Sequence, residues 1–128
     1  MHIPPGFNTV TPYIFVDGAP RFIEFLIQGL GGIETRRHMN GDRIANAQVR
    51  LGTSTVMVSE SVPDFPAMPA SYYLYVENAD AAMEKAITAG AIQIMAVADM
   101  PYKDRQGGVK DPCGNIWWIS QRLEDGPY

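Results

Sequence analysis

Residues 13–24, YIFVDGAPRFIE, return with changes as YLYVENADAAME at residues 73–84. The matches, all sixty positions apart, are Tyr13 with Tyr73, Val16 with Val76, Ala19 with Ala79 and Glu24 with Glu84. An internal repeat of this kind indicates one supersecondary unit that occurs twice. The sequence therefore predicts two copies of a single unit that pack together.

Each copy opens with a β-rich run and continues as an amphipathic helix. The runs are residues 9–16 and 71–76, and the spacing of apolar side chains predicts helices over residues 19–29 and 79–89. Asn78 is a good N-cap, and Pro20 fits a first helical turn, where no backbone donor is lost. The apolar stripes of both helices are predicted to lie in the core.

Three further strands are predicted after each helix, so that each copy is βαβββ. In the first copy they are residues 33–39, 44–51 and 55–60, with Asn40-Gly41 as a hairpin turn that tolerates positive φ. In the second copy they are residues 92–97, 108–110 and 115–121. The polar loop at residues 99–107 is as compatible with a lid over residues 100–108 as with a solvated connection.

Composition restricts the class of protein and its partners. The chain has 128 residues, a net charge of −4 and no concentrated basic segment, which argues against nucleic acid as a partner. No apolar run is long enough to cross a membrane, and the first residues lack the pattern of a signal peptide, so a cytoplasmic location is expected. The single cysteine, Cys113, excludes an intrachain disulfide and a cysteine-based metal cluster.

The two βαβββ copies, with VDGA and VENAD before their helices and DPCGN at residues 111–115 before the last strand, resemble the glyoxalase/bleomycin-resistance/extradiol-dioxygenase (vicinal oxygen chelate) superfamily. The resemblance covers residues 8–123. It implies an α+β fold in which two tandem βαβββ units form an incomplete eight-stranded barrel with the helices outside. Residues 1–128 are expected to be a single glyoxalase-like domain, with units at about 8–60 and 71–123 and a proline-rich linker at 61–70.

Enzymes of this superfamily bind a divalent metal through side chains at four positions, which the resemblance places at Thr11, Met57, Ser71 and Trp118. These four residues lack the carboxylate and imidazole donors that such a metal needs, so no metal and no cofactor are expected. His38 is an alternative ligand, but it follows two arginines. Glu60 and Gln121 correspond to each other in the repeat and remain candidates for hydrogen bonding near one end of the cleft.

Side chains alternate between the two faces of a strand, so the four implied positions indicate which residues line the cleft. The residues of the alternate parity, among them Ile14, Val58, Trp117 and Ile119, are predicted to face the helices. The residues predicted to line the cleft and to bind a ligand are Thr11, Tyr13, Phe15, Gln48, Arg50, Met57, Ser59, Ser71, Tyr73, Tyr75, Trp118 and Ser120. The alternative is that these aromatic rings simply fill a closed barrel.

A cleft of aromatic rings and hydroxyl groups suits an organic ligand that is aromatic or cationic. The sequence therefore favours a metal-free small-molecule-binding protein of the bleomycin-resistance type, and the resemblance to this superfamily implies a homodimer. The alternative is a lyase, isomerase or dioxygenase of the same superfamily, with an atypical site in which Glu60, Tyr73 or Tyr75 is the titratable group. A purely structural domain explains the fold but not the aromatic pattern. Intrachain and swapped pairing of the units both remain open.

Overall fold

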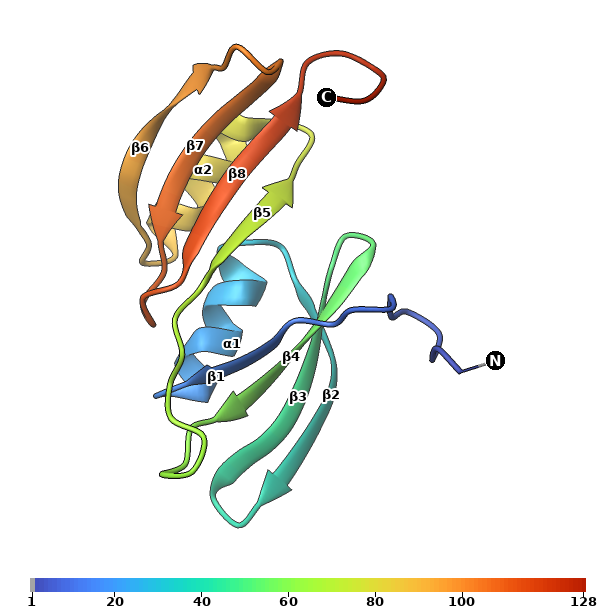
Figure 1. The fold of residues 1–128 in the computed structure, drawn as a ribbon. Coiled ribbons are helices and arrows are strands. Elements are labelled where there is room, and N and C mark those ends of the chain that lie inside the picture. Colours follow the sequence, from blue (N-terminus) through green and yellow to red (C-terminus); the bar gives the residue numbers. More distant parts are fainter. Residues whose placement is uncertain (1) are drawn as a thin grey trace.

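Two copies of one βαβββ unit follow each other in the computed structural model, which describes residues 2–128 (Figure 1). The first unit contains β1 (Tyr13–Val16), α1 (Ala19–Gln28), β2 (Ile33–Asn40), β3 (Arg43–Leu51) and β4 (Ser54–Glu60). The second contains β5 (Ser71–Tyr75), α2 (Ala79–Thr88), β6 (Ile92–Asp99), β7 (Asp104–Lys110) and β8 (Ile116–Arg122). The predicted α+β class and tandem βαβββ units are confirmed, and both helices lie within one residue of their predicted ends.

Each unit forms its own open, mixed four-stranded sheet. The strand orders are β1-β4-β3-β2 and β5-β8-β7-β6, with the first strand of each unit parallel to its last strand. The eight strands are thus divided between two sheets, and in the described part of the chain the two units contact each other through α1 and α2. Each helix packs against the strands of its own sheet, as Figure 1 shows for α2 behind β7 and β8, and the opposite face of each sheet is left open.

The core lies between each sheet and its helix. Six strand residues of the helix-facing parity are buried, as the pattern predicts: Ile14, Val16, Val56, Val58, Trp117 and Ile119. Leu74 and Val76, of the same parity, are half-buried against this core. Phe22 and Leu26 of α1 and Met83 and Ala86 of α2 are buried against these strand residues. None of the helices in residues 2–128 is long and apolar enough to cross a membrane.

The turn before β8 has a physical explanation in the carboxylate of Asp111. This buried side chain accepts hydrogen bonds from the backbone amides of Cys113 (2.8 Å) and Asn115 (3.0 Å) and from the indole nitrogen of Trp117 (2.8 Å). Gly114 has a φ of 88°, a conformation that glycine adopts without strain. The DPCGN sequence therefore closes the turn and fixes the first tryptophan in the core.

Three sequence predictions about element boundaries are wrong. Strand β7 begins at Asp104, because residues 104–107 pair with β8, so the loop before it is only residues 100–103, which favours a short connection over a lid. The first strand begins at Tyr13, and Thr11 precedes it. The first hairpin turns at Gly41 and Asp42, one residue later than predicted, since Asn40 still pairs with Arg43.

Candidate functional site

The open face of the first sheet carries aromatic side chains in a row with polar ones. Tyr13 is paired with Met57, and Met57 with Gln48, so these three side chains lie side by side on one face. The rings of Tyr13 and Phe15 have centroids 4.8 Å apart. Together with Ser59 and residues of the linker they line a hollow of about 490 Å³, which is within the size range of small-molecule sites.

The open face of the second sheet is built in the same way. Tyr73 pairs with Trp118, and Trp118 pairs with Gly108. A side-chain carbon on Gly108 would meet the indole ring of Trp118 at 2.7 Å, so the ring lies flat over the glycine. The rings of Tyr73 and Tyr75 have centroids 5.2 Å apart, and both side chains are exposed. Three aromatic residues and a glycine therefore lie together on this face, with the two tyrosine rings tilted by 48° to each other.

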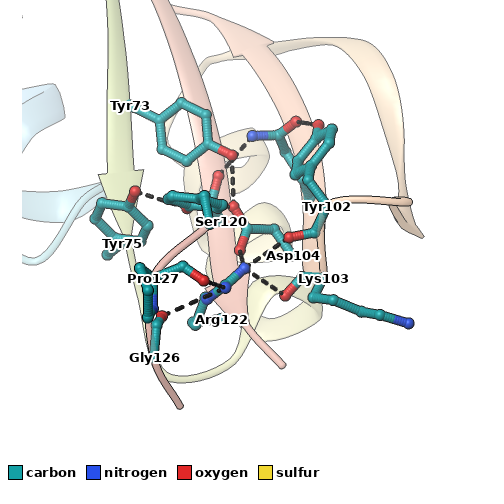
Figure 2. A network of polar contacts seen from close by, with 11 residues as sticks. Tyr73, Tyr75, Tyr102, Lys103, Asp104, Ser120, Arg122, Gly126 and Pro127 are labelled. Carbon is teal, nitrogen blue, oxygen red and sulfur yellow. Dashed lines mark hydrogen bonds and ion pairs between the residues drawn. The ribbon is translucent and has the colours of Figure 1, made fainter. Parts of the chain in front are cut away.

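A buried carboxylate lies beneath one edge of this surface (Figure 2). Asp104 is 0% exposed, and its Oδ2 atom accepts hydrogen bonds from the hydroxyls of Tyr73 (2.6 Å) and Tyr128 (2.6 Å). Its Oδ1 atom accepts one from the guanidinium of Arg122 at 3.1 Å. Asp104 and Arg122 face each other in the register of β7 and β8. The pair keeps a charged acceptor next to the open face.

The hydrogen bonds around Asp104 determine the protonation of the group. Burial raises the pKa of its carboxyl, but the donors Tyr128, Tyr73 and Arg122 outweigh burial, and the net pKa lies below the usual range. Burial and the hydrogen bond to Asp104 raise the pKa of Tyr73. At neutral pH the site therefore contains a carboxylate, a guanidinium and neutral phenol hydroxyls.

The predicted hydroxyl groups of the strands are used within the sheets. Ser120 is buried; it accepts a hydrogen bond from the Gln106 side chain at 2.7 Å and donates one to the Trp118 carbonyl at 3.1 Å. Ser59 is buried and donates to the carbonyl of Ala45 at 2.8 Å. The hydroxyls of both serines are therefore bonded to groups of their own sheet.

The remaining predicted site residues are divided between the two sheets. Thr11 and Met57 line a small hollow together with residues 2–9. Arg50 is exposed near the far end of β3, where its pairing partner Thr55 is buried and bonded to the Gly6 carbonyl at 2.7 Å. Ser71 is exposed at the start of β5, paired with Ile116. Within one chain, therefore, each sheet carries its own part of the predicted set.

Glu60 and Gln121 cap helices. The two carboxylate oxygens of Glu60 accept hydrogen bonds from the backbone amides of Gly18 (2.9 Å) and Ala19 (2.8 Å), at the start of α1. The amide oxygen of Gln121 accepts one from Ala79 (3.0 Å), at the start of α2. These side chains satisfy helix amides, and Glu60 also lines the hollow beside Tyr13 and Phe15, so a hydrogen-bonding role in the cleft stays a prediction.

The four positions at which the superfamily binds a metal do not fit a divalent cation here. Thr11, Ser71 and Met57 offer two hydroxyls and a thioether, and the Trp118 ring offers no oxygen and lies against Gly108. In residues 2–128 no group of three histidine, cysteine or acidic side chains is arranged to hold a metal ion. His38 is exposed on β2, opposite Asn46.

Sequence reasoning missed Asp104, Arg122, Gln106 and Tyr128. Asp104 and Gln106 were assigned to a loop, because a polar and glycine-rich segment such as DRQGG does not have the apolar alternation of a strand. Arg122 lies just beyond the predicted end of the last strand. No local signal marks the Asp104–Arg122 pair, because only the register of β7 and β8 brings the two residues opposite each other.

Comparisons with known proteins agree with this architecture. No protein-family model matches the chain. Two uncharacterized mycobacterial proteins are similar in sequence. One, from Mycobacterium bovis, is 28% identical over 91% of this chain and 84% of its own length. The other, from Mycobacterium tuberculosis, is 28% identical over 91% of this chain and 75% of its own length.

Three crystal structures are similar in fold. TioX from Micromonospora sp. ML1 has a TM-score of 0.74 at 20% identity, covering 89% of this chain and 99% of its own. TnmS3, an antibiotic binding protein from Streptomyces sp. CB03234, has 0.70 at 16%, covering 90% and 97%. A glyoxalase/bleomycin resistance protein/dioxygenase from Nocardioides has 0.68 at 18%, covering 93% and 86%. The chain has the fold of the glyoxalase/bleomycin resistance protein/dioxygenase superfamily.

Proposed function

We propose that this chain is a small-molecule-binding protein of the bleomycin-resistance type, which holds an aromatic organic ligand without a metal. The open face of the second sheet carries the proposal. Tyr73 and Tyr75 are 45% and 58% exposed there, beside Trp118 and above the buried carboxylate of Asp104. Exposed rings around a few fixed polar groups are what a site for a flat organic molecule requires.

The candidate titratable groups favour binding over catalysis. A general acid or base works best when its pKa is near the working pH. Glu60 holds the amides of α1, the pKa of Asp104 is lowered by its hydrogen-bond donors, and that of Tyr73 is raised. The donor chemistry at Thr11, Met57, Ser71 and Trp118 argues against a metal-dependent reaction.

We also propose that the protein is a homodimer whose cleft forms between the open faces of two copies. The two open faces within one chain lie on separate sheets, and the units contact each other through their helices. A second copy would bring the first sheet of one chain opposite the second sheet of the other and cover the exposed rings. The antibiotic binding protein TnmS3, which has the same fold, agrees with the proposed ligand class.

A thermal-shift screen with aromatic and cationic compounds tests the proposal, because a ligand that binds only the folded state raises the melting temperature. We expect aromatic compounds to stabilise the wild-type protein and to stabilise a Trp118→Ala variant much less. A screen in which no compound stabilises the wild-type protein would contradict the binding function. Stoichiometric zinc, nickel, manganese or iron in protein purified without chelator would overturn its metal-free part and favour an enzyme.

A further inference from the structure

The segment that follows β8 folds back onto the open face of the second sheet and places a phenol ring on it. The hydroxyl of Tyr128 is 2.6 Å from Asp104 Oδ2 and 2.7 Å from the hydroxyl of Tyr75. The guanidinium carbon of Arg122 lies 4.2 Å from the centroid of the Tyr128 ring. Arg122 also donates to the carbonyls of Gly126 (3.4 Å) and Pro127 (3.1 Å), as Figure 2 shows.

These contacts form a complete recognition site for one chemical group. The Asp104 carboxylate accepts a hydrogen bond from the Tyr128 hydroxyl, and the guanidinium supports the face of the ring. Because the single hydroxyl hydrogen of Tyr128 is used on Asp104, the Tyr75 hydroxyl is the donor in its bond to the Tyr128 oxygen. We propose that this is a phenol subsite of the cleft, that Tyr128 occupies it in the free protein, and that a hydroxy-aromatic ligand displaces Tyr128. The inference rests on the proposed binding function and narrows its ligand class.

The charge balance of the subsite selects a neutral donor over a cation. Arg122 already pairs with Oδ1 of Asp104 at 3.1 Å, so the two charges cancel within the site. An ammonium group at Oδ2 would lie on the same carboxylate as the guanidinium and be repelled by it. A phenol hydroxyl makes the same short hydrogen bond without that repulsion.

Tyr128 is suited to displacement because most of its surface is exposed to solvent. Its side chain is 69% exposed, although its hydroxyl reaches a carboxylate that is 0% exposed. Asp104 retains Tyr73 and Arg122 as partners when Tyr128 leaves, so the buried charge stays compensated. A ligand binds only while the site is empty, so its apparent association constant is the intrinsic one multiplied by the empty fraction, and removal of the Tyr128 ring should raise it.

The test uses three probes of similar size, 4-ethylphenol, 4-ethylanisole and phenethylamine, titrated by NMR into the full chain. We expect Tyr128→Ala to bind 4-ethylphenol roughly tenfold more tightly than wild type, the scale of one charge-assisted hydrogen bond. Tyr128→Phe, which keeps the ring and loses the hydroxyl, should fall between them. The ether and the amine should gain much less from Tyr128→Ala. Tyr72→Phe, which removes a hydroxyl from the half-buried, helix-facing side of β5, should leave all three affinities unchanged.

Two further results decide the inference. In the Tyr128→Ala background, Asp104→Asn should remove most of the gain for 4-ethylphenol. The second result uses wild-type protein with ring-labelled tyrosine. Saturating 4-ethylphenol should shift the NMR signal of Tyr128 to the position that this signal has in the Asp104→Asn variant. This measurement does not require the double variant to fold. Equal affinity of wild type and Tyr128→Ala for 4-ethylphenol would overturn the inference. The proposed function is tested separately by the thermal-shift screen. It stands if aromatic compounds stabilise the wild-type protein more than the Trp118→Ala variant, and it is contradicted if no compound stabilises the wild-type protein.

Discussion

The two adjacent tryptophans have opposite roles because neighbouring strand residues face opposite sides of the sheet. Trp117 is 2% exposed, packs in the core and donates its indole hydrogen to Asp111. Trp118 lies on the open face, over Gly108. Gly107, one residue earlier, makes room for Met83 and Val97 on the helix side, so two adjacent glycines also serve the two faces.

The matched substitutions Trp117→Phe and Trp118→Phe should therefore differ in kind. We expect Trp117→Phe to cost about 2–3 kcal/mol of unfolding free energy, since it leaves a small cavity and removes a donor from the buried Asp111. Trp118→Phe should cost less than about 1 kcal/mol and weaken ligand binding. Urea titrations and the ligands from the screen measure both effects. Equal losses of stability in the two variants would contradict the assignment.

Asp104 should make stability depend on pH in the acid range. Its folded pKa lies below the usual value of about 3.9, so its stabilisation is complete above that value and is lost as the pH falls through the folded pKa. Asp104→Asn should be less stable at pH 7 by about 1.5–3 kcal/mol and lose less stability below pH 4. Urea titrations from pH 7 to pH 2.5 provide the comparison. A variant that tracks wild type at every pH would show that Asp104 does not have this role.

At the scale of elements, the repeat is expressed in the way each helix begins. The last strand of each unit supplies the side chain that accepts the first helix amides: Glu60 of β4 for α1 and Gln121 of β8 for α2. Only α2 has a local cap as well, since Asn78 accepts from Ala81 at 3.0 Å, whereas Gly18 before α1 has no capping side chain. The longer-range bond should therefore matter more for α1.

Glu60→Ala should cost about 1–2 kcal/mol, and Gln121→Ala about 1 kcal/mol or less, as the loss of a helix cap predicts. The two effects should add within about 0.5 kcal/mol, because the caps lie in different units and share no partner. Thermal or urea unfolding of the two single variants and the double variant measures this. Affinity for the screened ligands should not change. A strong loss of binding in Glu60→Ala at unchanged stability would show that Glu60 contacts the ligand.

The sequence predicted the elements whose signal is local. The repeat, the helix periodicity and the Asn78 cap gave both helices and the βαβββ order, and strand alternation separated Trp117 from Trp118. The start of β7 was missed because Asp104 and the following Arg-Gln-Gly are held in the sheet by pairing with β8, which no local pattern shows. For the same reason the Asp104–Arg122 pair, which depends on register, could not be predicted.

At the scale of the whole molecule, no helix or strand covers either open face in the described part of the chain, and only the linker and the segment after β8 reach them. Two open sheets in one chain are joined by a linker at residues 61–70 and by contacts between the helices. The linker is itself held, since Met68 donates to Phe15 at 3.1 Å and Ala70 to Asn115 at 3.0 Å. The linker contacts and the contacts between the helices therefore fix how the two units are arranged. Because this arrangement keeps the two open faces on separate sheets, it favours closure of the cleft by a second copy over closure within one chain.

Mixing two variants that are each defective in one face distinguishes these two arrangements. Tyr13→Ala damages the first sheet and Trp118→Ala the second, so each homodimer should bind the screened ligand poorly. If each cleft combines the first sheet of one copy with the second sheet of another, a mixed dimer has one cleft with both substitutions and one with neither. Random exchange after mild unfolding should then restore about a quarter of the sites, since half of the dimers are mixed.

Light scattering during the same experiment should give a particle of twice the 14.1 kDa chain mass. The matched control is a mixture of Trp118→Ala with Tyr75→Ala, two substitutions on the same face, which should restore no binding because every cleft retains a defect. A dimer in which the first mixture also restores nothing would show that each cleft lies within one chain. A particle of single-chain mass that binds ligand fully would exclude the second copy from the site altogether.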